Sequence, residues 1–78
     1  MPRYYFDIHD GQRFTQDEEG SDCASPEAAR EEAIRTLPSI AREIPLDGGK
    51  VEMWVKVRTE GGRNIAKASL TLRSEWLE

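Results

Sequence analysis

Between residues 51 and 58 the chain alternates between two kinds of side chain, and this pattern restricts the fold more than any other feature. Val51, Met53, Val55 and Val57 take every second position, and Trp54 is the only apolar residue among those between them. Successive side chains of a strand point to opposite faces of a sheet, so this alternation predicts a half-buried β-strand.

The next apolar run fits the same sheet. Gly61-Gly62 is a candidate two-residue turn. Folding the chain there pairs Val57 with Ala66, Val55 with Ala68, Met53 with Leu70 and Val51 with Leu72. All four pairs are apolar and share one face, so the turn and the pattern predict the same antiparallel hairpin.

A second hairpin is predicted at the start of the chain. Tyr4, Phe6 and Ile8 alternate with polar neighbours, and Asp10-Gly11 is a turn signal. A three-residue loop, His9-Asp10-Gly11, pairs Phe6 with Phe14 on the apolar face, whereas a two-residue loop turns Phe14 to the polar face. We therefore expect the three-residue loop, which also sets Asp7 opposite Arg13.

A helix is predicted between the hairpins, from about residue 26 to 43. Ser25 is a candidate N-cap and Pro26 suits the first helical position. One apolar stripe follows: Ala29, Ala33, Leu37, Ile40 and Ile44. Pro38 lacks a backbone N–H group, so we expect the helix to be kinked or broken near it.

These elements predict an α+β fold of ββαββ order, with four antiparallel strands and the helix packed on one face. The first strand is the most apolar around its circumference, which favours a central place and the strand order 2-1-3-4. Seventy-eight residues suit a single domain, residues 1–78.

Composition and net charge limit the cellular compartment and the kinds of partner that we expect. The single cysteine, Cys23, allows no internal disulfide, and a lone thiol suits a reducing compartment. No stretch has the length and apolarity of a membrane span or a secretory signal, so we expect a cytoplasmic protein. The net charge of −4 argues against non-specific nucleic-acid binding.

The face of the sheet away from the helix is predicted to be open to solvent. Ile65 is one of the residues predicted to lie on this face. The candidate binding residues of this face are Tyr5, Trp54, Lys56, Arg58, Lys67 and Arg73. Two aromatic rings among cations suit a protein-contact face, or a surface that stacks bases and binds phosphates. An ordinary solvated sheet face has a similar composition.

No pattern predicts a catalytic or metal site. The acidic run at residues 17–22 lacks the spacing of an EF-hand, because Gly20 is its fourth residue rather than its sixth. His9 and Cys23 have no sequence-local catalytic partner. If Met1 is removed, Pro2 presents a secondary amine such as small tautomerases use, although those enzymes begin strand, helix, strand. We expect no metal, no cofactor and no enzymatic activity.

Four segments together resemble a family of short alphaproteobacterial proteins of unknown function. They are Pro2-Arg3-Tyr4-Tyr5-Phe6, Asp10-Gly11, Asp17-Glu18-Glu19-Gly20 and residues 27–33. The resemblance extends to Trp76-Leu77 and implies a bacterial cytoplasmic protein of rhizobial type, but it implies no activity or site.

A helix start of the form Ser-x-Glu-x-Ala, here Ser25 to Ala29, is also similar to antitoxins of the HicB kind, which bind a small toxin.

The sequence therefore predicts a small binding or interaction domain whose partner is itself or another protein. We expect a homodimer formed through the open face or an edge strand. A nucleic-acid-binding module, a HicB-like toxin partner and an enzyme using Pro2 remain as alternatives.

Overall fold

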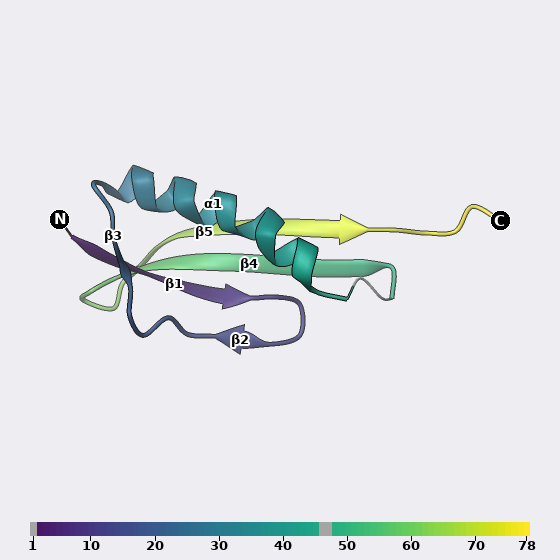
Figure 1. Cartoon of the computed structure of the whole chain (residues 1–78), viewed down its shortest axis with the longest axis horizontal. Helices are drawn as coiled ribbons and strands as arrows, with labels where there is room; N and C mark the ends of the chain where they lie inside the picture. The colour runs from purple at the N-terminus through teal and green to yellow at the C-terminus, as the bar shows by residue number, and fades with distance from the viewer. Residues whose placement is uncertain (1, 46–47) are drawn as a thin grey trace.

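The computed structural model describes residues 2–45 and 48–78, and Figure 1 shows its arrangement. Its elements are β1 (Arg3–His9), β2 (Phe14–Thr15), β3 (Ser21–Asp22), α1 (Pro26–Glu43), β4 (Lys50–Thr59) and β5 (Asn64–Arg73). The described residues form an α+β fold with one helix on one side of an open antiparallel sheet.

The sheet has the order β2-β1-β4-β5, which confirms the predicted order of its main strands. It holds five strands among the described residues rather than the predicted four, because β3 also pairs with β1. β2 and β3 occupy the same edge of β1, and residues 16–20 separate them. The acidic run thus interrupts an edge of the sheet.

The hairpin β4–β5 confirms the four predicted apolar pairs, from Val57–Ala66 to Val51–Leu72. The prediction of a two-residue turn at Gly61-Gly62 was wrong. Arg58 pairs with Asn64, and the register shifts between Val57 and Arg58, so the turn is longer and Ile65 is the extra residue. Ile65 packs against the core instead of facing the open side as predicted. The bulge compensates for the longer turn and leaves the apolar register unchanged.

The register predicted for the first hairpin was wrong. Phe14 pairs with His9 rather than with Phe6, so it lies on the open face, and His9 belongs to β1 rather than to the loop. The side chain of Asp10 accepts hydrogen bonds from the backbone N–H groups of Gln12 and Arg13, at 3.0 and 2.8 Å. With Gly11 at a φ of +103°, these bonds stabilise a four-residue turn.

Helix α1 begins as predicted. The Ser25 hydroxyl accepts a hydrogen bond from the N–H of Ala28 at 3.1 Å, and Pro26 follows it. The helix continues through Pro38 without the break that was one of the two predicted outcomes. Pro38 is exposed, and because it has no N–H group it leaves the carbonyl of Ile34, itself an exposed residue, without its helical partner.

The core lies between α1 and strands β4 and β5. Its buried apolar residues are Tyr4, Ala29, Ala33, Leu37, Met53, Val55 and Val57. Since Val55 is fully buried and Trp54 is not, the predicted assignment of the two sheet faces is confirmed. The helix contacts β4 and β5, so the strands at the β2 and β3 edge are left partly uncovered.

Candidate binding surfaces

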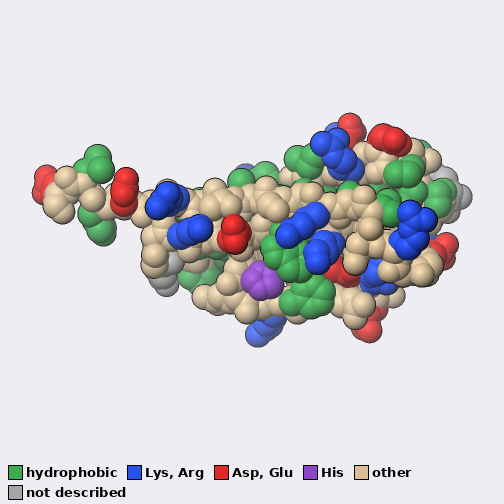
Figure 2. All heavy atoms as spheres, turned by 180° about the vertical axis from the view of Figure 1, so that it is seen from behind, with side chains coloured by type: hydrophobic (Ala, Val, Ile, Leu, Met, Phe, Trp, Pro, Cys, Tyr) green, Lys and Arg blue, Asp and Glu red, His purple; other side chains and the backbone are tan. Residues whose placement is uncertain are grey.

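All six predicted binding residues lie on the sheet face opposite the helix, which we call the open face. Trp54, Lys56 and Arg58 alternate with the buried valines of β4. Their cross-strand partners share their face: Tyr5 lies opposite Arg58, and Lys67 opposite Lys56. Arg73 lies opposite Lys50 in the same way. Figure 2 shows cationic side chains over the strands of this face, around the histidine.

Trp54 is the centre of an aromatic cluster that the sequence only partly revealed. The ring of His9 stacks on it with centroids 5.3 Å apart and planes 17° from parallel. Phe14 lies 5.7 Å away at a 42° tilt and is 52% exposed. His9 and Phe14 were missed as members of this cluster because the register of the first hairpin was mispredicted. The sequence signal for their pairing is their position on either side of the turn residues Asp10-Gly11.

Two lysines complete the surroundings of Trp54. The Nζ atoms of Lys56 and Lys67 lie 4.9 and 5.3 Å from its ring centroid, within cation–π range. The two ammonium groups come from directly opposed residues and repel one another. This patch of β4 and β5 therefore concentrates positive charge beside an aromatic surface and suits an anionic, apolar partner.

Arg58 has a different role from the two lysines. Its Nε donates to Oδ2 of Asp7 at 3.0 Å, and its Nη2 donates to Oδ1 of Asp7 at 3.2 Å and to the carbonyl of Asp17 at 2.9 Å. The guanidinium also lies 4.7 Å from the ring centroid of Tyr5. Arg58 is thus engaged within the domain, and the pairing predicted for Asp7 with Arg13 was wrong.

The carboxylate of Asp7 is buried beneath these contacts, with 5% of the residue exposed. Burial by itself raises the pKa of Asp7, but the hydrogen bonds from Arg58 and from the backbone N–H of Asp17 outweigh it. The net result is a pKa below the usual range, so Asp7 stays ionised at neutral pH. These contacts give Asp7 a structural role in joining β1 to β4.

Asp17 organises the acidic loop. Its Oδ2 accepts from the N–H of Phe6, and its Oδ1 accepts from those of Glu19 and Gly20, each at 3.1 Å. Burial by itself raises the pKa of Asp17, but these three bonds, together with the charge of Arg58, lower it overall. The Asp17 side chain therefore fills the gap between β2 and β3 and satisfies the β1 donor exposed there.

Gly20 is needed where the loop returns to the sheet. Its φ is +75°, and a Cβ atom there would lie 2.8 Å from Cγ of Arg3 and 2.9 Å from Cε2 of Tyr5. Arg3 also donates from Nη1 to the carbonyl of Glu19 at 2.6 Å. These contacts give the acidic run a structural role.

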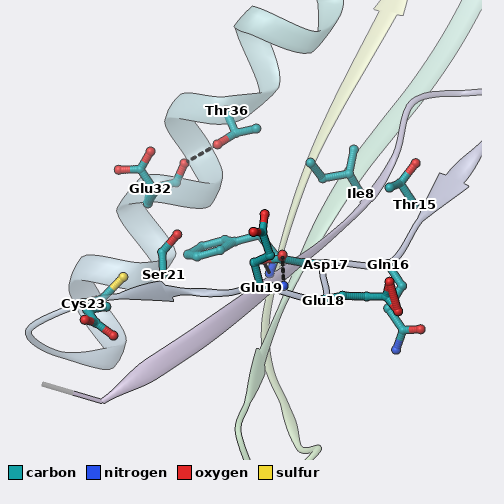
Figure 3. Close-up of a pocket in the computed structure, with 12 residues that line it drawn as sticks. Ile8, Thr15, Gln16, Asp17, Glu18, Glu19, Ser21, Cys23, Glu32 and Thr36 are labelled. Carbon is teal, nitrogen blue, oxygen red and sulfur yellow. Dashed lines mark hydrogen bonds between the residues drawn. The ribbon is translucent and has the colours of Figure 1, made fainter.

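A groove of about 760 Å³ lies on the helix side, between α1 and the interrupted edge. Phe6, Ile8 and Cys23 are among the residues that line it, and Glu18, Glu19, Asp22 and Glu32 make its lining acidic. Figure 3 shows lining residues from the helix, β1 and the loop, among them Glu32, Ile8 and Glu19.

Cys23 and Pro2, the remaining candidate groups, lie close together near the start of β1. Cys23 lies in the groove, where burial and the charges of Glu32 and Asp22 raise the pKa of its thiol. Pro2 is exposed before β1, its carbonyl accepts from the N–H of Cys23, and Met1 lies outside the described residues. Among residues 2–45 and 48–78, no group of three or more His, Cys, Asp and Glu side chains could hold a metal ion. No helix in this part of the chain has the length and apolarity needed to cross a membrane.

The fold and these surfaces define a small α+β domain with one helix-covered face and one open, cationic, aromatic face. The chain belongs to the family of domains of unknown function designated DUF6894, whose model matches residues 3–71. Comparison with curated proteins and with solved structures gives no match.

Proposed function

We propose that this protein is a small non-enzymatic binding domain that associates with a second copy of itself through the open face. The observation that carries the proposal is the exposed aromatic cluster of Trp54, His9 and Phe14 beside two lysines. A half-exposed phenylalanine adjoining a tryptophan is apolar surface that association can remove from water.

The contacts of the open face favour a protein partner over a nucleic acid. Stacking of bases needs free ring faces, but His9 already stacks on Trp54 and two ammonium groups lie close to the same ring. Arg58 is engaged by Asp7, which leaves Lys56, Lys67 and Arg73 as the predicted cations for phosphates.

Nucleic-acid binding is the second candidate, because the open face is basic although the chain carries a net charge of −4. It predicts that a fluorescent single-stranded oligonucleotide binds at low salt, with an affinity that falls steeply as salt is added. Absence of any anisotropy change at low salt would remove this candidate.

We further propose a cytoplasmic location in a bacterium of the rhizobial type, which rests on the resemblance of the opening residues 2–6. A HicB-like toxin partner rests on the similar order of a strand pair, an acidic glycine-containing loop and the helix start, and an enzyme using Pro2 requires loss of Met1. Mass spectrometry that finds Met1 retained would exclude the enzyme.

An edge strand is the other surface through which two copies could pair. Within the described residues, β5 has β4 on one side and no strand on the other, and such an edge can pair with another strand. Hydrogen exchange distinguishes the two surfaces. Pairing through β5 would slow the hydrogen exchange of its outward-facing backbone amides as the protein concentration rises. Association through the open face would leave the exchange rates of these amides unchanged and would instead shield side chains around Trp54.

The main experiment is sedimentation equilibrium of three proteins over a wide concentration range. We expect the wild type to dimerise and Lys67→Glu to change the dimer Kd, because the charge beside Trp54 is reversed. Arg35→Glu makes the same charge change on the exposed side of α1 and should leave the dimer intact. A wild type that stays monomeric at all concentrations would refute the proposal.

Trp54→Ala provides a second test that does not depend on charge. It should weaken the dimer, and circular dichroism must first show that the variant is folded, since Trp54 supports His9 and Phe14. A folded Trp54→Ala protein that dimerises like the wild type would exclude this face as the contact.

A further inference from the structure

Residues 74–78 are all exposed and contain two large apolar side chains. Trp76 is 94% exposed and Leu77 is 90% exposed. Figures 1 and 2 show this segment, which we call the tail, extending from the end of β5 clear of the rest of the protein. Such exposure of adjacent tryptophan and leucine marks an interaction site.

Two copies cannot pack their open faces directly together without an electrostatic cost. In a symmetric dimer the same patch meets itself, so Lys56 and Lys67 of each copy would face like charges. An anionic, apolar element between them would remove this cost. The tail has this composition, because Glu75 and Glu78 flank Trp76 and Leu77.

We infer that the tail of one copy docks on the open face of a second copy, with Trp76 against the Trp54 cluster and its flanking glutamates near the lysines. This inference rests on the proposed self-association and names the segment that fills the interface. Tryptophan is among the residue types that most often dominate the energy of such contacts.

The acidic groove on the helix side is a poorer receptor for the same segment. Its lining includes Glu18, Glu19 and Glu32, which would repel the glutamates of the tail. The open face is the surface of opposite charge. Charge therefore favours the open face over the groove.

The backbone geometry favours docking between copies over docking within one copy. Ser74 donates from its N–H to the carbonyl of Gly49 at 2.7 Å, which directs the tail onward from β5. Trp54 lies opposite Ser69, well back along β5 from the end of the strand at Arg73. To reach its own Trp54, the tail would have to reverse direction at this anchored point.

The inference is tested by sedimentation equilibrium of Trp76→Ala and Leu77→Ala beside the wild type. Both side chains are almost fully exposed, so neither change should alter the fold of the monomer. We expect Trp76→Ala to raise the dimer Kd about tenfold or more. If Trp54→Ala weakens the dimer and both tail variants leave it unchanged, the tail inference fails while the proposed function stands.

Charge exchange gives a test of the receptor. Glu75→Lys with Glu78→Lys should weaken the dimer, and so should Lys56→Glu with Lys67→Glu. A chain carrying all four changes should recover affinity, because a basic tail then meets an acidic face. No recovery in a folded four-change protein would overturn the assignment of the open face as receptor.

Fluorescence separates docking between copies from docking within one copy. The sequence has two tryptophans, so Trp54→Phe leaves Trp76 as the single reporter and keeps an aromatic receptor. We expect its emission to shift to shorter wavelength as concentration rises. A shift that is present at every concentration indicates docking within one copy. No shift in a Trp54→Phe protein that sedimentation equilibrium shows to dimerise indicates that the tail does not dock. Either result would overturn the inference.

Discussion

Replacement of Asp17 by alanine removes the side chain that closes the interrupted edge of the sheet. Three backbone N–H groups lose a charged acceptor at 3.1 Å. Those of Glu19 and Gly20 lie in a surface loop where water can replace the carboxylate. The N–H of Phe6 belongs to the central strand β1 and is harder to solvate, so its loss carries most of the cost.

Hydrogen bonds to charged groups contribute about 1.5–3 kcal/mol each, and the two solvated ones contribute less, so Asp17→Ala should cost about 2–4 kcal/mol. A chain of this length has a free energy of unfolding of about 4–12 kcal/mol, so the loss is a large part of it. The corresponding decrease in Tm is about 10–25 °C. Urea unfolding and thermal melts followed by circular dichroism measure both quantities.

The contribution of Asp17 to the free energy of unfolding depends on pH. The folded state holds the pKa of Asp17 below its unfolded value, so the stabilisation is complete above about pH 4. It is lost as the pH falls through the folded pKa. Asp17→Ala should therefore lower stability at neutral pH and reduce the steepness of the acid-induced loss.

Glu18→Ala is the matched control, because it removes the same charge from the adjacent, exposed position of the same loop. It should change the free energy of unfolding by at most about 0.5 kcal/mol. The role given to the Asp17 hydrogen bonds would be refuted if the two variants were equally stable. It would also be refuted if Asp17→Ala lost stability at low pH as steeply as the wild type.

Three further predictions concern the core, the helix and the groove. Met53 is fully buried, so Met53→Ala should cost about 2–5 kcal/mol in urea unfolding, and a loss below about 1 kcal/mol would contradict its place in the core. Ser25→Ala removes the cap of α1 and should cost about 1 kcal/mol, whereas Ser25→Asp, which retains an acceptor, should cost much less. The raised pKa of Cys23 predicts slow alkylation by iodoacetamide at pH 7 and a rate that increases with pH, while the protein unfolded in urea reacts faster. Equal rates for the folded and unfolded protein at pH 7 would contradict it.

Much of the fold could be predicted because its signals are local. The alternation in residues 51–57 correctly assigned both faces of β4, and the four apolar pairs with β5 followed from it. Ser25-Pro26 located the start of α1. The break that Pro38 allowed is absent, since a proline on the solvent side of a helix that is packed over β4 and β5 leaves the helix continuous.

The candidate surface could be predicted in outline but not in its contacts. All six residues chosen for the open face lie there, since each follows from strand periodicity. His9 and Phe14 were missed because a four-residue turn closed by Asp10 replaced the expected three-residue loop. A turn that differs by one residue reverses the face of everything after it, and apolar pairing alone does not reveal its length.

By itself, the sequence determined which residues alternate into a sheet, where the helix begins and which face is apolar, because these depend on neighbours a few positions away. Only the tertiary structure decided that Asp7 pairs with Arg58, 51 positions further along the chain. The same holds for Asp17, which bonds to Phe6 across 11 positions. Such contacts depend on which strands come together in space, and neither periodicity nor turn chemistry specifies which side chain will meet a given charge.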